Sequence, residues 1–195
     1  EPVVRGDGSG STSAGPDSKQ SLAPESALDL ECQAAMLLEM NTGSLVYGKN
    51  LDMRREPASL TKVMTCLLAM ERGNLDDKIT ISDTALKGLD PNGSSAGLVE
   101  GETLTLKELL YCLIISSAND AAPVIAEYIS GSQDAFVELM NQRAKELGCT
   151  GTHFANPHGL HDDDHYSTAR DLSRMMLEAM KFEVFREIIA TERHY

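Results

Sequence analysis

Ser59 and Lys62 form the first pair of residues in the sequence whose types and spacing suggest covalent chemistry. They follow Pro57 at the expected start of a helix, where residues three apart lie on one face. A serine hydroxyl becomes a nucleophile when a base lies within hydrogen-bonding reach, and burial lowers the pKa of a lysine toward that role. Free N–H groups at a helix start also favour a developing oxyanion. Taken alone, the pair is more typical of a helix-capping serine beside a solvated lysine.

A second polar segment, residues 116–120, interrupts two apolar stretches that are expected to be helices. It contains Ser117, 58 residues after Ser59, and Asn119 two positions further on. Short polar side chains between two buried helices have to face another polar group. Taken alone, Ser117 and Asn119 are more simply explained as caps of the following helix, a role that Asp120 could also fill. The turn-rich residues 90–97, between the two motifs, form either the rim of a cleft or an ordinary surface loop.

The elements that must position these residues are mainly helical. Apolar periodicity and capping residues predict five helices, over residues 60–71, 105–115, 121–129, 133–147 and 168–181. A β-hairpin is predicted from strands within 33–39 and 44–48 around a turn at 41–43, with a further short strand at 78–82. One hairpin cannot cover so much apolar helical surface, because most sheets contain more strands. We therefore expect the 195 residues to be the front portion of a larger fold.

Composition and charge argue against several classes of function. The chain has 195 residues, with 17 Lys and Arg against 30 Asp and Glu, and its formal net charge is −13. This acidic excess argues against binding to nucleic acid or to an anionic membrane surface. The longest apolar run, residues 109–115, is far too short to span a membrane. The four cysteines form no C-x-x-C pair, which argues against a zinc ribbon or thioredoxin-type site, and Cys66 and Cys112 are expected in the core.

Residues 1–29 have the composition of a flexible linker. Gly, Ser, Pro and Asp dominate residues 5–21, so the segment cannot bury enough apolar surface to offset the entropy of ordering it. A spacer between an export signal and a folded domain has this kind of composition. The expected organisation is therefore a linker at residues 1–29, followed by the N-terminal part of a catalytic domain at residues 30–195.

The segment after residue 156 combines three histidines and three aspartates in a way that suggests a metal site: His158, His161 and His165 with Asp162, Asp163 and Asp164. Imidazole and carboxylate donors together suit zinc or manganese. Pro157 and Gly159, however, make the segment a loop rather than a helix with the histidines on one face. A solvated acidic loop with locally hydrogen-bonded histidines is the simpler interpretation, and we assign no metal to it.

Together, the two polar motifs resemble those of the penicillin-recognising serine enzymes, which carry S-x-x-K, then S-[DGA]-N, then K-T-G. The first motif here is Ser59-Leu60-Thr61-Lys62, and the second is Ser117-Ala118-Asn119. The sequence resembles above all the D-alanyl-D-alanine carboxypeptidases, the low-molecular-mass penicillin-binding proteins, over residues 32–195. Family-like stretches lie at residues 55–65, 116–121, 131–137, 152–160 and 166–172.

The resemblance implies an α/β fold of the β-lactamase and penicillin-binding-protein type, an antiparallel sheet with a helical subdomain, truncated here within its sheet part. It implies a secreted, extracytoplasmic enzyme that removes the terminal D-Ala from peptidoglycan pentapeptides, is inhibited by β-lactams and needs no cofactor. Ser59 would form the acyl-enzyme and supply, through its backbone N–H, half of the oxyanion hole. Lys62 would accept the Ser59 proton, Ser117 would relay it to the leaving amine, and Asn119 would hold Lys62 and the substrate amide.

The sequence departs from the family pattern at the third motif, because residues 1–195 contain no K-T-G. In the family, this motif brings the second oxyanion donor and the carboxylate-binding groups. We therefore expect residues 1–195 alone to be inactive and prone to self-association. Two rival functions stay open. A class A-like β-lactamase would use a glutamate for deacylation, and no E-x-x-L-N-type segment follows Asn119. The other rival is a non-catalytic penicillin-binding sensor or wall-binding module.

Overall fold

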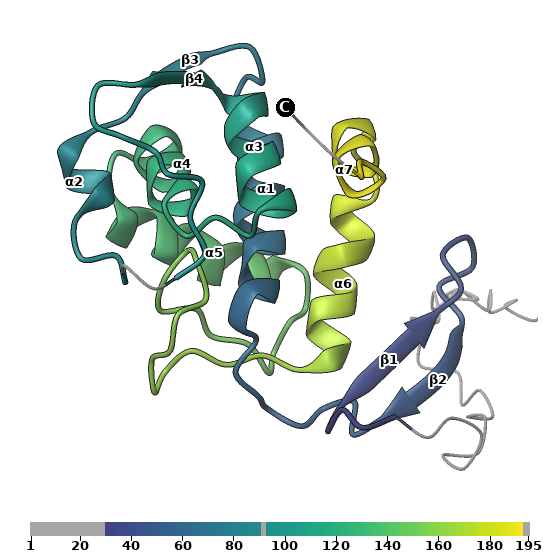
Figure 1. Cartoon of the computed structure of the whole chain (residues 1–195). Coiled ribbons are helices and arrows are strands. Elements are labelled where there is room, and N and C mark those ends of the chain that lie inside the picture. The colour runs from purple at the N-terminus through teal and green to yellow at the C-terminus, as the bar shows by residue number, and fades with distance from the viewer. Residues whose placement is uncertain (1–29, 91–92, 193–195) are drawn as a thin grey trace, which may run out of the picture.

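Helices make up most of the fold and surround one central helix, α1 (Lys62–Arg72) (Figure 1). The computed structural model describes residues 30–90 and 93–192, and the linker predicted at 1–29 lies outside the described residues. The other helices are η2 (Ala58–Thr61), α2 (Asp83–Leu86), α3 (Leu106–Ile115), α4 (Ala121–Ser130), α5 (Gln133–Glu146), α6 (Ala169–Ala179) and α7 (Glu183–Ile189). The strands are β1 (Ala35–Leu38), β2 (Leu45–Lys49), β3 (Lys78–Thr80) and β4 (Thr103–Thr105). Within the described ranges, no helix has both the length and the apolar character needed to cross a bilayer.

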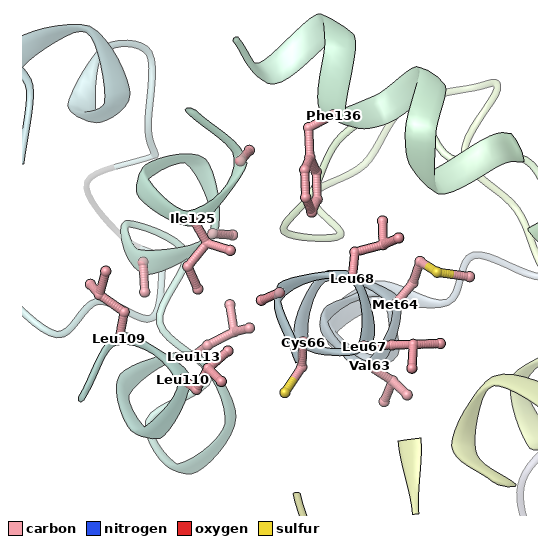
Figure 2. Packing of buried hydrophobic residues seen from close by; sticks show 14 of the residues in the cluster. Val63, Met64, Cys66, Leu67, Leu68, Leu109, Leu110, Leu113, Ile125 and Phe136 are labelled. Atoms are coloured by element: carbon pink, nitrogen blue, oxygen red, sulfur yellow. The ribbon is translucent and has the colours of Figure 1, made fainter. Parts of the chain in front are cut away.

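The first two turns of α1 are buried on all sides, because α3, α4, α5 and α6 pack around them. Apolar side chains of α1 therefore point in several directions rather than along one stripe. Figure 2 shows Leu68 directed toward Phe136 of α5, with Leu113 of α3 on another side of the helix. The predicted core position is confirmed for Cys66, which is fully buried, while Cys112 is half-buried. This packing fixes the helix whose first residue is Lys62.

Capping side chains set the starts of α3, α5 and α6, and these helices lie within two residues of their predicted positions. Thr105 and Glu108 form a reciprocal capping box at the start of α3. Ser132 and Thr168 each accept a backbone N–H from three residues further along, at the starts of α5 and α6. The first predicted helix differs at its start, because the short 3-10 turn η2 precedes α1.

The predicted hairpin is confirmed as β1 and β2, which pair antiparallel with an irregularity between Leu37 and Leu38. The short strand predicted at residues 78–82 is β3, and it pairs antiparallel with β4. The hairpin lies beside α6 at the edge of the helical part (Figure 1). The sequence analysis did not predict β4, α2 or α7. Two of these elements have only three or four residues, which is too short for a periodic pattern.

Candidate active site

Ser59 lies in η2, the tight turn that leads into α1. Pro57 precedes this turn with φ −74°, close to the value that its ring imposes, and Ala58 follows with φ +48°. A positive φ at a residue with a side chain is strained and persists only where the surrounding structure enforces it. The turn leaves the Ser59 side chain exposed at the end of a helix that is otherwise buried.

Lys62 lies at the centre of the candidate site and is only 2% exposed. Its Nζ lies 3.3 Å from Ser59 Oγ and 3.4 Å from Ser117 Oγ. It donates to Asn119 Oδ1 at 2.8 Å and to the backbone carbonyl of His158 at 2.9 Å. The structure thus brings together the four residues that the sequence analysis assigned to the site, from segments more than 50 positions apart.

Burial lowers the pKa of the Lys62 amine to about 8, because the charged form loses hydration. Its four hydrogen-bond partners are hydroxyl, amide and carbonyl oxygens, which are neutral groups. At pH 7, a pKa of about 8 leaves roughly a tenth of such amines neutral, against roughly one in 3,000 for an ordinary lysine. Lys62 is therefore suited to accept a proton from Ser59.

Ser117 and Asn119 enter the site from the segment between α3 and α4. Ser117 has φ +53°, a second strained position beside Ser59, and its hydroxyl donates to Ser59 Oγ at 2.9 Å. Asn119 is buried, and its backbone N–H donates to the Ser94 carbonyl at 2.8 Å. The side chain that caps α4 is Asp120, which accepts from the first N–H of that helix. The simpler interpretation of Ser117 and Asn119 as helix caps is therefore wrong.

Asp120 anchors the loop at residues 93–98 beside the site. Its carboxylate accepts hydrogen bonds from the Ser95 hydroxyl at 2.5 Å and from the N–H groups of Ala96 and Leu98 at 3.0 and 3.1 Å. Burial acts to raise the pKa of Asp120, but these hydrogen bonds outweigh it, and the net pKa is lowered. The carboxylate therefore stays charged and holds the described part of the predicted rim loop in place.

A second loop, residues 153–168, lies against the first turns of α1 through its backbone. Besides the His158 carbonyl on Lys62, the Pro157 carbonyl accepts a hydrogen bond from Thr65 Oγ1 at 2.7 Å. Gly159 has φ +90° and lies so close to the Ala58 carbonyl that a Cβ at this position would overlap it. The sequence analysis missed these contacts, because a backbone carbonyl leaves no residue-type signal. Only the glycine itself hinted at a close approach.

The three histidines considered as metal ligands, His158, His161 and His165, do not converge on one point. His158 Nδ1 accepts a backbone N–H at 3.1 Å, and burial is the main cause that lowers the pKa of His158 to about 4. The ring of His161 faces Glu56 at the surface, with 3.2 Å between Nδ1 and Oε1. The ring of His165 contacts Thr61 inside the fold. In the part of the chain that the structure describes, no three His, Cys, Asp or Glu side chains are grouped to hold a metal ion.

Curated relatives match the chain over most of its length. D-alanyl-D-alanine carboxypeptidase DacF of Bacillus subtilis is 41% identical over 182 residues, which cover 91% of this chain and 46% of the relative. D-alanyl-D-alanine carboxypeptidase DacA of Escherichia coli is 38% identical over 152 residues, which cover 74% of this chain and 38% of the relative. The chain thus spans less than half the length of these two proteins.

Solved structures show the same architecture. A mutant of the Streptomyces K15 DD-transpeptidase superposes with a TM-score of 0.79 at 32% identity, covering 83% of this chain and 65% of that one. Penicillin binding protein 5 from Haemophilus influenzae gives a TM-score of 0.74 at 32% identity, covering 83% of this chain and 47% of that one. The predicted α/β fold of the penicillin-binding-protein type is therefore confirmed. Because the sequence pattern of the family matches residues 19–195, the chain belongs to the D-alanyl-D-alanine carboxypeptidase family.

Proposed function

We propose that this chain carries the nucleophile and base of a serine-type carboxypeptidase that removes the terminal D-Ala from peptidoglycan pentapeptides. One observation carries the proposal: the buried Lys62 amine lies within 3.4 Å of the hydroxyls of both Ser59 and Ser117. Family membership over residues 19–195 supports the choice of reaction. Because the chain spans less than half of its curated relatives, the activity is proposed for the protein as its gene encodes it.

In the proposed reaction, Ser59 Oγ attacks the carbonyl carbon of the penultimate D-Ala, and its proton passes to Lys62 Nζ. The bond between that carbonyl and the nitrogen of the last D-Ala breaks, and the proton reaches the leaving nitrogen through Ser117. The 3.4 Å contact between Lys62 Nζ and Ser117 Oγ supports this route, and the 2.9 Å hydrogen bond between the two serine hydroxyls holds Ser117 beside the reacting oxygen. Water then attacks the ester on Ser59, which releases the shortened peptide. Asn119 orients Lys62 through its 2.8 Å hydrogen bond and, by resemblance, holds the substrate amide.

The developing oxyanion needs two donors, and the backbone N–H of Ser59 is proposed as one of them. In the family, the second donor and the groups that bind the substrate carboxylate come with the K-T-G motif, which residues 1–195 do not contain. Removing one oxyanion donor typically slows acyl transfer by about a hundred- to a thousand-fold. The proposed turnover therefore requires a protein in which that motif is present.

The proposed substrate is a peptidoglycan stem peptide that ends in D-Ala-D-Ala. β-Lactams are the proposed inhibitors, because their strained amide offers Ser59 an alternative carbonyl and leaves an ester on the same oxygen. Peptidoglycan lies outside the cytoplasmic membrane, so we propose an extracytoplasmic site of action, either secreted or attached to the membrane or cell wall. The proposed reaction requires no metal or cofactor, since its proton transfers run between Ser59, Lys62 and Ser117.

The proposal is tested by the release of D-Ala from a diacetyl-Lys-D-Ala-D-Ala peptide by the full protein as encoded. We expect turnover by the wild type and none above background by Ser59→Ala. A fluorescent penicillin should label the wild type covalently and leave Ser59→Ala unlabelled, because the variant has no oxygen to acylate. Thermal unfolding of both proteins controls for the fold. Labelling of Ser59→Ala at the wild-type rate would contradict the assignment of Ser59.

The same two assays separate the rival functions. Rapid hydrolysis of penicillin without release of D-Ala would favour a β-lactamase. Stoichiometric acylation by penicillin without D-Ala release would favour a non-catalytic sensor or wall-binding module. Acylation alone does not discriminate, because a working carboxypeptidase is also trapped by penicillin.

A further inference from the structure

His165 is a buried histidine whose two ring nitrogens are both engaged, although the proposed reaction does not use it. The ring is 2% exposed. The backbone N–H of Ala155 donates to Nδ1 at 3.0 Å, so Nδ1 must carry a lone pair. The proton of the neutral ring therefore sits on Nε2, which lies 2.7 Å from Thr61 Oγ1 and donates to it. This pair of bonds selects one tautomer of the neutral imidazole.

Thr61 lies between the proposed nucleophile, Ser59, and the proposed base, Lys62. It is the last residue of η2 and is fully buried, and Lys62 follows it directly. A contact on its hydroxyl therefore fixes the turn from which both Ser59 and Lys62 project. If the His165 ring is removed, the Thr61 hydroxyl loses a buried hydrogen-bond partner, and such a loss is costly.

The ring also belongs to the loop that supplies a carbonyl to Lys62. His165 and His158 lie in the same segment, and the His158 carbonyl accepts from Lys62 Nζ at 2.9 Å. Phe154 packs edge-on against the His165 ring, with 5.7 Å between ring centroids. The bond to Thr61 thus ties the loop at residues 153–168 to the residue that precedes Lys62, and the same loop bonds the Lys62 amine.

We propose that His165 is a positioning residue for acyl transfer: as a neutral ring it fixes Thr61 and keeps the loop closed over the Lys62 amine. This inference rests on the proposed function of Ser59 and Lys62. In this role, His165 keeps water away from the Lys62 amine, and burial of that amine is what lowers its pKa. Loosening the contact admits water to the amine and returns its pKa toward 10.5.

Protonation of His165 at low pH would disrupt its hydrogen bonds in this loop. A proton on Nδ1 of His165 would displace the Ala155 N–H, and burial already holds the pKa of His165 below its usual value. Burial is the dominant cause of this lowered pKa; among the ionisable groups, Asp162 and Glu56 act to raise the pKa of the ring and His153 acts to lower it. His158 lies in the same loop, and His165 is one of the groups that lower the pKa of His158.

The test measures the rate of acylation by a fluorescent penicillin from pH 5 to pH 10, using the full protein as encoded. In the wild type, the rate should rise with a kinetic pKa near that of Lys62. In His165→Ala, we expect this kinetic pKa to increase by at least about one pH unit, which lowers the rate at pH 7 about tenfold. Thr61→Val, which keeps the side-chain shape but removes the acceptor, should show the same displacement. His165→Gln, which keeps a donor near the place of Nε2, should recover most of the rate.

His153 offers a matched control, because it lies in the same loop but is exposed and bonds only its own loop, through Asp164 O at 2.6 Å. His153→Ala should keep the wild-type profile. A merely structural His165 would lower the melting temperature and leave the kinetic pKa of the folded protein unchanged, and that result would overturn the proposal. If His165→Ala does not fold, the kinetic pKa of acylation in Thr61→Val serves as the test instead.

A direct titration of the Lys62 side chain by NMR separates this proposal from the proposed function. The pKa of Lys62 should be higher in Thr61→Val than in the wild type, whether or not the protein turns over a peptide. If the wild type neither reacts with penicillin nor releases D-Ala, the proposed function fails, and the NMR comparison still tests His165. An unchanged Lys62 pKa in Thr61→Val would refute the positioning role even in an active enzyme.

Discussion

In the proposed reaction the chemistry depends most on Lys62, because this residue contacts Ser59 and has a lowered pKa. Lys62→Arg keeps a positive charge but cannot release a proton at working pH. We expect this variant to lose acylation by penicillin by at least a hundredfold, in keeping with the loss of a general base. Circular dichroism and thermal unfolding check that the fold is kept. Near-normal acylation by Lys62→Arg would mean that another group acts as the base.

The pH dependence of acylation follows from the same residue. The pKa of Lys62 is lowered to about 8, and in the proposed reaction the neutral amine is the reactive form. Below this value, the neutral fraction rises about tenfold for each pH unit, and above it the fraction levels off. The acylation rate of the full protein should therefore climb between pH 6 and pH 8 and reach a plateau beyond. A profile that is flat over this range would show that Lys62 does not lose a proton in the rate-determining step.

Residue types and spacing singled out the side chains of the candidate site, and the family resemblance supplied their expected roles. Serine, lysine and asparagine carry their chemistry in the side chain, so Ser59, Lys62, Ser117 and Asn119 stood out from the printed sequence. The His158 carbonyl did not, because any residue has one. His165 was considered only as a metal ligand or a solvated loop residue. Its partner Thr61 lies 104 positions earlier, and no local pattern records a contact of that range.

Helices were predictable from the sequence where capping residues mark their ends. α3, α4 and α5 have a capping side chain at the start, and a glycine such as Gly131 ends a helix in the left-handed conformation. The strand β4 escaped prediction because its three residues end on Thr105, the residue that caps α3. β4 forms because it pairs with β3, more than 20 residues earlier in the chain, and the local sequence around β4 does not show this pairing.

Packing between the loop at residues 153–168 and the turn η2 makes Gly159 a sensitive position. A Cβ there would overlap the Ala58 carbonyl and lie 2.9 Å from Thr61 Oγ1, in addition to the strain of φ +90°. Gly159→Ala should therefore push the loop away from the nucleophile. We expect a stability loss of about 2–4 kcal/mol, as for other strained or overpacked sites, and a more than tenfold slower acylation. Urea unfolding and penicillin labelling measure the two effects.

Gly131 provides the matched control for Gly159. It also has a positive φ, +77°, but a Cβ at this position meets nothing within 4 Å. Gly131→Ala should cost about 1–2 kcal/mol, the usual penalty for an alanine in the left-handed region, and leave the acylation rate of the folded protein unchanged. Equal effects of the two substitutions on acylation would argue that backbone strain, rather than contact with η2, is what matters at Gly159.

On the scale of the whole molecule, apolar side chains are buried in the helical part but partly exposed in the hairpin. α1 is enclosed by helices, whereas three apolar side chains of the hairpin region are about half exposed: Leu37 at 50%, Met40 at 54% and Val46 at 46%. A groove of about 640 Å³ lies between the hairpin, η2 and α6, lined largely by Met and Leu side chains. Exposed apolar surface beside a two-stranded sheet favours association with further polypeptide.

The last prediction concerns residues 1–195 as an isolated chain. They carry the proposed nucleophile and base but no K-T-G motif, and they span 46% of the Bacillus subtilis relative. Without a second oxyanion donor, acyl transfer should be slower by about a hundred- to a thousand-fold. We expect this chain to release no D-Ala above background and, in analytical ultracentrifugation, to associate through the uncovered hairpin. Supplying a segment that carries the K-T-G motif of the family, in the same chain or as a second polypeptide, should restore turnover and yield a species of defined size. A monomeric chain of 195 residues with full carboxypeptidase activity would show instead that Ser59, Lys62 and Ser117 suffice without a K-T-G strand.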